Sequence, residues 1–152
     1  MSIVYLGIDP GKSGAICTVD ILGFPDTLVK LNKEPSEIWD KLSNISIDRK
    51  CIAAIELVNA MPGQGVSSTF KFGESFGMLV GLLTASGIPF DKVRPAVWCK
   101  AMGLKRKEKE SNTSWKNRHK QLAKKLFPEL EDITHATADA LLIAEYCRRT
   151  NI

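Results

Sequence analysis

Residues 3–20 have the sequence IVYLGIDPGKSGAICTVD, in which a glycine-rich turn separates two apolar runs. Residues 3–8 are continuously apolar and end at an Asp-Pro-Gly turn that begins at Asp9, which predicts a buried strand. A second strand is expected over 13–20, and the short connection predicts that the two strands pair as a hairpin. A third strand, over 27–31, follows the next glycine-proline turn. This part of the chain therefore predicts a three-stranded meander.

Beyond the meander, apolar strands alternate with helices. Strands are predicted over 51–57 and 89–94, and the first of these is apolar except for Glu56, as is typical of a parallel strand covered on both faces. A meander followed by alternating strands and helices predicts a mixed sheet covered by helices, in one domain of residues 1–152. Helical patterns are found over 35–42, 69–86, 95–102, 115–127 and about 134–148.

The composition excludes several classes of protein. With 44% hydrophobic and 25% charged residues, the chain is typical of a folded globular protein. The four cysteines are scattered without a CxxC pair, which argues against a zinc site or a disulfide framework and indicates a reducing cytosol. No apolar run approaches the roughly 20 residues that span a bilayer, and the N-terminal apolar run is too short for a cleavable signal. We therefore expect a cytoplasmic protein without a membrane partner.

Positive charge is concentrated in one part of the chain. Ten of the 21 Lys and Arg residues fall within 100–125, against two acidic residues in the same range. Such a local excess is typical of a surface that binds a polyanion. Without other evidence, the same run of charge could equally be a solvated helix face beside a charged loop with no ligand.

Three carboxylates lie on elements that otherwise look like core. Asp9 ends the first strand, Glu56 interrupts an apolar strand, and Asp139 lies among Ala, Leu and Ile in the last helix. Each has an ordinary explanation: a turn, an exposed strand end, or a partner arginine. Burying three charges is costly unless they are paired or bind a cation. Together they predict a Mg²⁺ site, and two such ions about 4 Å apart would support phosphodiester hydrolysis.

Two further motifs bear on this site. His135 lies one helical turn before Asp139 on the same face, which makes it a candidate fourth ligand or general base; a role at the helix N-terminus is the alternative. The Gly-Lys-Ser sequence at 11–13 resembles the end of a P-loop, which requires GxxxxGK[ST]. The upstream Gly7 is one residue too close, and Asp9 would lie among the phosphates. A nucleotide-binding loop is therefore not predicted.

Four segments, in this order and at these separations, resemble the RuvC family of Holliday-junction resolvases, in particular its bacteriophage type. They are GIDPGKSGA at 7–15, IE at 55–56, MPGQGVSS at 61–68 and ADALLIA at 138–144, and the resemblance covers nearly the whole length. It implies an α/β fold of the RNase H-like class, with a five-stranded mixed sheet flanked by helices on both faces. It also implies a homodimer that cleaves two opposed strands of a four-way DNA junction with Mg²⁺, or Mn²⁺ as a substitute, and no small-molecule cofactor.

The resemblance assigns metal binding and catalysis to Asp9, Glu56 and Asp139. The fourth position departs from the family pattern: Ala136 stands where an acid or histidine is common, so His135 is expected to be the fourth ligand. Lys116, which we also count as catalytic, and Lys120 are expected to hold phosphate near the scissile bond. The 59–68 segment should overhang the cleft and probe the junction centre. The full set of expected DNA contacts is Lys105, Arg106, Lys107, Lys116, Lys120, Gln64, Ser67 and Ser68.

The 69–86 helix carries glycines at 73, 77 and 81, which are expected either at a dimer interface or against the protein's own sheet. A protein of bacteriophage type would act in the host cytoplasm. Two alternative functions are found on the same fold. Half of an actin-like ATPase would need a second phosphate-binding lobe, for which 152 residues leave no space. A catalytically weak or inert branched-DNA-binding protein is disfavoured by the retained acids, but His135 keeps that alternative open.

Overall fold

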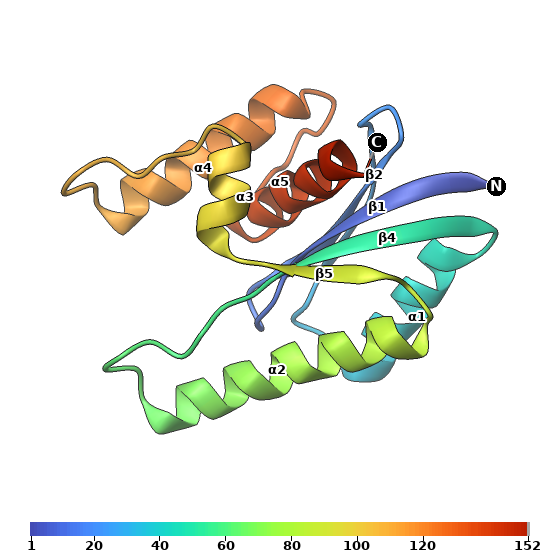
Figure 1. Cartoon of the computed structure of the whole chain (residues 1–152), viewed down its shortest axis with the longest axis horizontal. Helices are drawn as coiled ribbons and strands as arrows, with labels where there is room; N and C mark the ends of the chain where they lie inside the picture. Colours follow the sequence, from blue (N-terminus) through green and yellow to red (C-terminus); the bar gives the residue numbers. More distant parts are fainter. Residues whose placement is uncertain (152) are drawn as a thin grey trace.

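The computed structural model of the protein describes residues 1–151, and its centre is a five-stranded mixed sheet (Figure 1). The strands lie in the order β3-β2-β1-β4-β5. β2 is antiparallel to β1 and β3, whereas β4 is parallel to β1 and β5 is parallel to β4. The predicted meander and mixed sheet are therefore confirmed. The strands are β1 (Ser2–Asp9), β2 (Ala15–Asp20), β3 (Pro25–Lys30), β4 (Arg49–Glu56) and β5 (Phe90–Val93).

Helices cover both faces of the sheet, as expected. On one face lie α1 (Pro35–Ser46) and α2 (Val66–Ala85), and on the other α3 (Pro95–Ala101), α4 (Asn112–Leu126) and α5 (His135–Thr150) (Figure 1). Successive side chains of a strand point to opposite faces. Val4, Leu6 and Ile8 of β1 accordingly pack with α1 and α2, and Tyr5 packs with α5. Among residues 1–151, no helix is both long enough and apolar enough to cross a membrane.

The helix boundaries follow local capping interactions. α1 begins with Pro35 at its first turn, preceded by a capping box between Glu34 and Glu37. The Ser111 hydroxyl caps α4 by accepting a hydrogen bond from the backbone of Ser114. α2 and α4 each begin three residues before the predicted start. The first turn of each helix is polar or faces solvent. The helical spacing of apolar residues, by which a helix is predicted from sequence, therefore begins only in the second turn.

Helix α5 approaches the backbone of β1 very closely at Gly7. A Cβ atom added at Gly7 would lie 2.1 Å from the Ala140 carbonyl oxygen and 2.1 Å from the Ala144 nitrogen. Both atoms belong to helix backbone, which cannot move aside as a flexible side chain can. The small residues of α5 at 138, 140 and 144 are buried on this surface. Gly7 therefore sets the distance between the sheet and its central helix.

Replacing Gly7 with Ala should lower the free energy of unfolding by about 3 kcal/mol or more, the upper end for overpacking, because the new methyl group meets rigid backbone. Asn44→Ala is the control, because Asn44 lies on the exposed side of α1 and its new methyl group stays in solvent. That variant should gain ~0.5 kcal/mol from the higher helix propensity of alanine. Urea unfolding measures both, and equal stability of the two variants would contradict the close packing of α5.

Candidate active site

Asp9 and Glu56 lie side by side because β1 and β4 are parallel and in register. Ile8 stands opposite Ile55, so the next residues, Asp9 and Glu56, end neighbouring strands at the same edge. Both are on the α5 face of the sheet, two residues beyond Gly7 and Ala54. Glu56 is 9% exposed, and Asp9 is partly exposed. The strand pairing thus holds two carboxylates together at one end of the sheet.

Asp139 joins them from helix α5. It is 2% exposed and directly precedes Ala140, whose carbonyl oxygen lies against Gly7. Burial raises the pKa of Asp9 well above its ordinary value, and the negative charges of Glu56 and Asp139 raise it further. Three acids from β1, β4 and α5 therefore lie close enough to repel one another.

Asp139 is compensated by two partners on α4. The Nδ1 atom of His119 lies 2.7 Å from its Oδ1, and the Lys116 ammonium forms an ion pair with its Oδ2. Burial would raise the pKa of Asp139, but the hydrogen bond from His119 and the charge of Lys116 outweigh burial and hold that pKa below its ordinary value. Asp139 is therefore the acid most strongly kept as a carboxylate.

Glu56 is held by α3. The indole Nε1 of Trp98 donates a hydrogen bond of 2.7 Å to Oε2 of Glu56. Burial nevertheless keeps the pKa of Glu56 above its ordinary value, because the Trp98 hydrogen bond only partly offsets the loss of water. The Lys116 pKa is raised in turn: burial would lower it, but Asp139, Asp9 and Glu56 favour its charged form. One half-exposed ammonium thus balances part of the charge of three carboxylates.

His119 is a site residue that the sequence analysis missed. It is 2% exposed, and its ring packs edge-to-face against Trp115 and Trp98, with centroids 4.3 and 5.4 Å away. Its Nε2 atom is buried and has no hydrogen-bond partner within residues 1–151, a condition that costs about 1–3 kcal/mol. Helical spacing could have identified it, because His119 lies four residues after Trp115 and four before Ala123. These positions share the buried face of a helix whose other residues are mainly basic.

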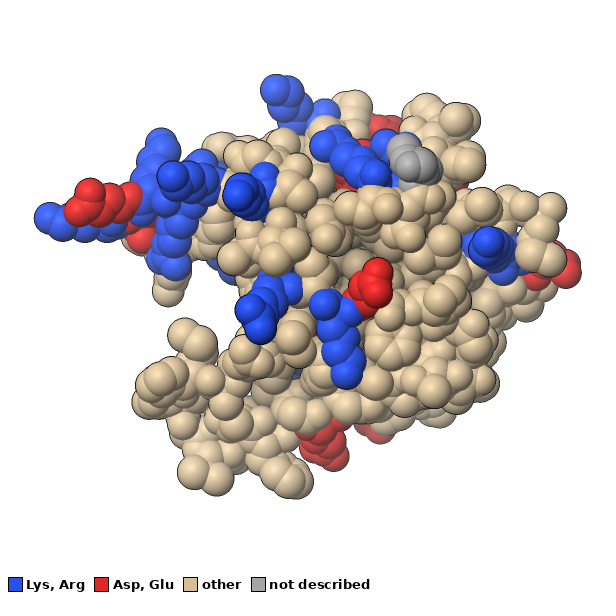
Figure 2. Space-filling model, in the orientation of Figure 1, with Lys and Arg blue, Asp and Glu red and all other residues tan. Residues whose placement is uncertain are grey.

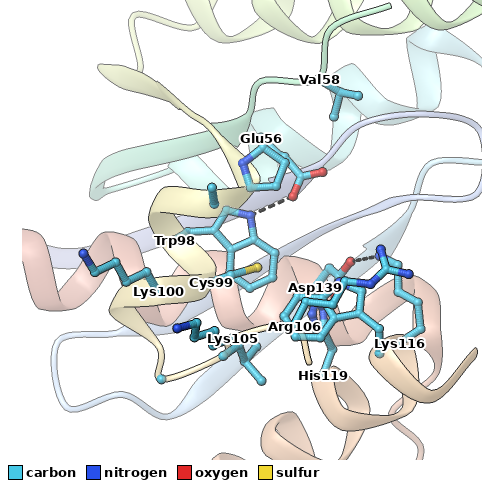
Figure 3. A pocket seen from close by; sticks show the side chains of 15 residues that line it. Glu56, Val58, Trp98, Cys99, Lys100, Lys105, Arg106, Lys116, His119 and Asp139 are labelled. Atoms are coloured by element: carbon cyan, nitrogen blue, oxygen red, sulfur yellow. Dashed lines mark hydrogen bonds and ion pairs between the residues drawn. The ribbon is translucent and has the colours of Figure 1, made fainter. Parts of the chain in front are cut away.

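Glu56 and Asp139 line a cleft of about 780 Å³ between α3, α4 and the segment that joins them (Figure 3). Trp98, Cys99 and Leu104 form its apolar wall. Basic side chains complete the lining, namely Lys100, Lys105, Arg106 and Lys116. Of the expected DNA contacts, Lys105, Arg106 and Lys116 are therefore brought to the same cleft as the carboxylates.

Charge is distributed unevenly around the cleft. Lys and Arg side chains gather at the left of Figure 2, over residues 102–111 and the start of α4. Residues 57–70, which form the opposite tip, contain no charged residue. The expected DNA contacts Gln64, Ser67 and Ser68 are exposed on this tip. Lys107 is exposed within the basic segment of residues 102–111, and Lys120 is partly exposed on α4. The surface thus pairs a basic wall with an uncharged one.

His135 occupies a different position from the other predicted ligands. It is the first residue of α5, it is exposed, and its Nε2 lies 2.9 Å from Oδ1 of Asn117. It lines a second hollow with Gly11, Lys12 and Lys30, and neither His135 nor Asp9 lines the cleft that holds Glu56 and Asp139. Asp9 is nevertheless near enough to both acids for their charges to raise its pKa, whereas His135 contacts Asn117.

The donor set suits a hard cation. Carboxylate oxygens are the protein ligands that Mg²⁺ prefers, and a cation would relieve the repulsion that, together with burial, raises the Asp9 pKa. Within residues 1–151, however, no group of three or more His, Cys, Asp or Glu side chains is spaced to hold a metal ion. The chemistry of the acids thus fits the ion, while their side chains are more widely spaced than in a closed metal cage.

Two solved structures share this fold. One is "T. thermophilus RuvC in complex with Holliday junction substrate", with a TM-score of 0.68 and 17% identity over 98% of this chain and 96% of that one. The other is "Thermus thermophilus RuvC structure", with a TM-score of 0.59 and 15% identity over 99% and 96% of the two chains. No protein-family model and no curated protein matches the sequence. The likeness confirms the RNase H-like fold that the sequence predicted.

Asp9→Asn and Asp139→Asn should change stability in opposite directions at pH 7 in a chelating buffer. The pKa of Asp9 is raised on folding, so ionisation of Asp9 opposes folding as pH rises from the unfolded pKa through the folded one. Its removal should raise the free energy of unfolding, because the variant no longer buries a charge beside Glu56 and Asp139.

The pKa of Asp139 is lowered on folding, so its charge stabilises the protein above the unfolded pKa, and this contribution is lost as pH falls through the folded one. Asp139→Asn should therefore be destabilising. Urea unfolding at pH 7 and pH 4 measures both variants, and the Asp9→Asn gain should shrink at pH 4. A destabilised Asp9→Asn protein at pH 7 would show that Asp9 is not held under repulsion.

Proposed function

We propose that the protein is a divalent-metal-dependent, structure-selective endodeoxyribonuclease that resolves four-way junctions and other branched DNA. The observation that carries this proposal is the convergence of Asp9 with Glu56 and Asp139, because the last two line a cleft with a basic wall. The fold supports it, because a structure that shares it, RuvC, is in complex with a Holliday junction substrate. Metal-dependent hydrolysis of DNA uses both parts: acids to bind the metal and cations to hold the phosphate backbone.

Asp9, Glu56 and Asp139 would hold Mg²⁺, or Mn²⁺ in its place. When bound, the metal supplies positive charge for an attacking water and for the leaving oxygen of the scissile bond, with two ions as the preferred arrangement. His135 stays a prediction as a fourth ligand, and it would first have to leave Asn117. The described contacts favour a site built mainly on the three carboxylates.

Other side chains of the protein would bind the DNA substrate. Lys116 is half exposed and paired with Asp139, so a cation at Asp139 would release its ammonium toward the scissile phosphate. Lys105 and Arg106 line the cleft and would bind the backbone of one arm, followed by Lys107 and Lys120. The uncharged tip with Gln64, Ser67 and Ser68 would contact the junction centre rather than phosphate. These roles make substrate shape, rather than base sequence, the main determinant of binding.

We further propose that the active unit is a homodimer that associates through α2. A Cβ atom added at Gly73, Gly77 or Gly81 meets nothing within 4 Å, so these glycines face away from the protein's own sheet. Packing against the sheet, the alternative considered from the sequence, is therefore not supported. Phe70 is 73% exposed on the same helix, and Val66 is 88% exposed. A second copy would cover this surface and place two sites symmetrically, as a two-fold symmetric junction requires.

Cleavage of a synthetic four-way junction tests the enzymatic activity, with a linear duplex and a fork as comparison substrates. In Mg²⁺ or Mn²⁺ the protein should nick the junction in preference to the duplex. Glu56→Gln should slow the reaction by at least about a hundredfold, equivalent to ~2.7 kcal/mol, because it removes a metal-binding charge. A mobility-shift assay in EDTA should show junction binding within a few fold of wild type.

Glu131→Gln is the matched control, because Glu131 is an exposed acid outside the cleft, and it should cleave like wild type. Tight junction binding without metal-dependent cleavage would favour the inert DNA-binding protein instead. Equal cleavage by Glu56→Gln and wild type would contradict the proposed site.

Gly77→Glu should convert the dimer to a monomer, because it places a charge in the proposed interface but in open space on the monomer. The mass of one chain is 16.8 kDa. Sedimentation equilibrium should give twice this mass for wild type and the mass of one chain for the variant. Asn44→Glu, which adds the same charge to the exposed side of α1, should remain dimeric. A monomeric wild-type protein, or a dimeric Gly77→Glu variant, would rule out this interface.

A further inference from the structure

We propose that Trp98 and His119 are positioning residues that act as a connected pair, holding Glu56 and Asp139 in place for cation binding. The inference rests on the proposed function, because it concerns the same carboxylates. Neither residue is itself a ligand: each bonds to an acid that would be one.

Each residue of the pair donates a hydrogen bond to a different carboxylate. Trp98 Nε1 lies 2.7 Å from Glu56 Oε2, and His119 Nδ1 lies 2.7 Å from Asp139 Oδ1. Trp98 is 1% exposed and His119 is 2% exposed, so packing leaves neither ring free to change rotamer. A carboxylate bonded to a fixed donor keeps one oxygen in a defined direction. In Glu56 the other oxygen has no hydrogen bond within residues 1–151, and in Asp139 it is paired with the exchangeable ammonium of Lys116.

The two donors also contact one another. Their rings meet edge-to-face with centroids 5.4 Å apart, and Trp115 packs against the other side of His119 at 4.3 Å. One line of contacts therefore runs from Glu56 through Trp98 and His119 to Asp139 (Figure 3). It connects β4, α3, α4 and α5, so the separation of the two acids is fixed by packing as well as by the sheet.

The unpartnered nitrogen of His119 indicates that this residue is present for its bond to Asp139. A carboxylate can only accept, so Nδ1 donates, while Nε2 is buried among aromatic rings without a partner in the described chain. An apolar side chain of similar size would fill the same space without an unsatisfied nitrogen. Packing alone therefore does not explain a histidine here.

The pair corresponds to the outer partners that orient metal ligands in other proteins. Removing such a partner typically weakens metal binding about 10–100-fold. A purely structural role for Trp98 and His119 would have a different signature, because it would lower stability but leave the metal affinity of the folded protein unchanged.

Calorimetric titration of Mn²⁺ into the full chain, without DNA and well below the unfolding temperature, separates these roles. His119→Asn keeps an N–H where Nδ1 lies, whereas His119→Gln moves its donor to the place of Nε2. We expect His119→Asn to bind Mn²⁺ within about threefold of wild type, and His119→Gln and Trp98→Phe to bind about 10–100-fold more weakly. Circular dichroism checks that each variant is folded. If Trp98→Phe does not fold, the difference in Mn²⁺ affinity between His119→Asn and His119→Gln still separates a positioning role from a structural one.

The double variant tests whether the pair acts as a unit. His119→Gln with Trp98→Phe should lose less affinity than the product of the two single losses, because either change breaks the same line of contacts. Unchanged Mn²⁺ affinity in His119→Gln and Trp98→Phe, with a lower unfolding temperature, would overturn the inference and leave the proposed function standing. Equal affinities of His119→Asn and His119→Gln would also overturn it. Failure of wild type to bind Mn²⁺ would overturn the proposed function as well.

Discussion

The close approach of α5 to β1 at Gly7 determines where the acids of this protein meet. Gly7 lies two residues before Asp9 on the same face of the strand, and the Ala140 carbonyl that touches it follows Asp139. A side chain at position 7 would push the helix outward and carry Asp139 away from Asp9. Because β4 pairs in register with β1, the same contact also places Asp139 near Glu56. The candidate site is thus a direct consequence of how one helix packs on one strand.

This arrangement places like charges where water is scarce, and the surrounding residues offset only part of the repulsion. Asp139 has both oxygens engaged by α4, so its charge is stabilised by the fold. Asp9 has no comparable compensation, and its pKa is raised by burial and by its two neighbours. The proposed cation binding and folding stability would therefore be opposed at Asp9. Burial and repulsion of its charge weaken the fold, and a bound cation would relieve the repulsion. Strain of this kind is common where a protein is organised for function.

Most of the fold was predictable because its signals are local. Apolar runs, turns and helical periods specify the five strands and five helices. The Ser111 cap explains why α4 begins before its apolar face does, whereas α2 begins early without a side-chain cap. Asp9, Glu56 and Asp139 were also accessible from the sequence, because a charged residue on an otherwise apolar element is visible without knowledge of its neighbours.

Of the partners of these acids, Lys116 was expected near the site, but Trp98 and His119 were not accessible in the same way. Trp98 and His119 look like core residues in the sequence, and only the packing of α3 and α4 shows which carboxylates they meet. His135 shows the limit of helical periodicity, which predicted a shared face with Asp139. It lies at the first position of α5, where the chain reaches solvent and Asn117 offers a partner, while Asp139 lies one turn deeper and buried.

The central claim is that three mutually repelling carboxylates form one cation-binding group. Carboxyl-carbon NMR titration of Asp9, with and without saturating Mg²⁺, tests it most directly. In the metal-free protein the pKa of Asp9 should lie well above 3.8, and Mg²⁺ should lower it because a bound cation stabilises the charged form. An ordinary pKa for Asp9, or a raised pKa that Mg²⁺ leaves unchanged, would contradict this account of the site.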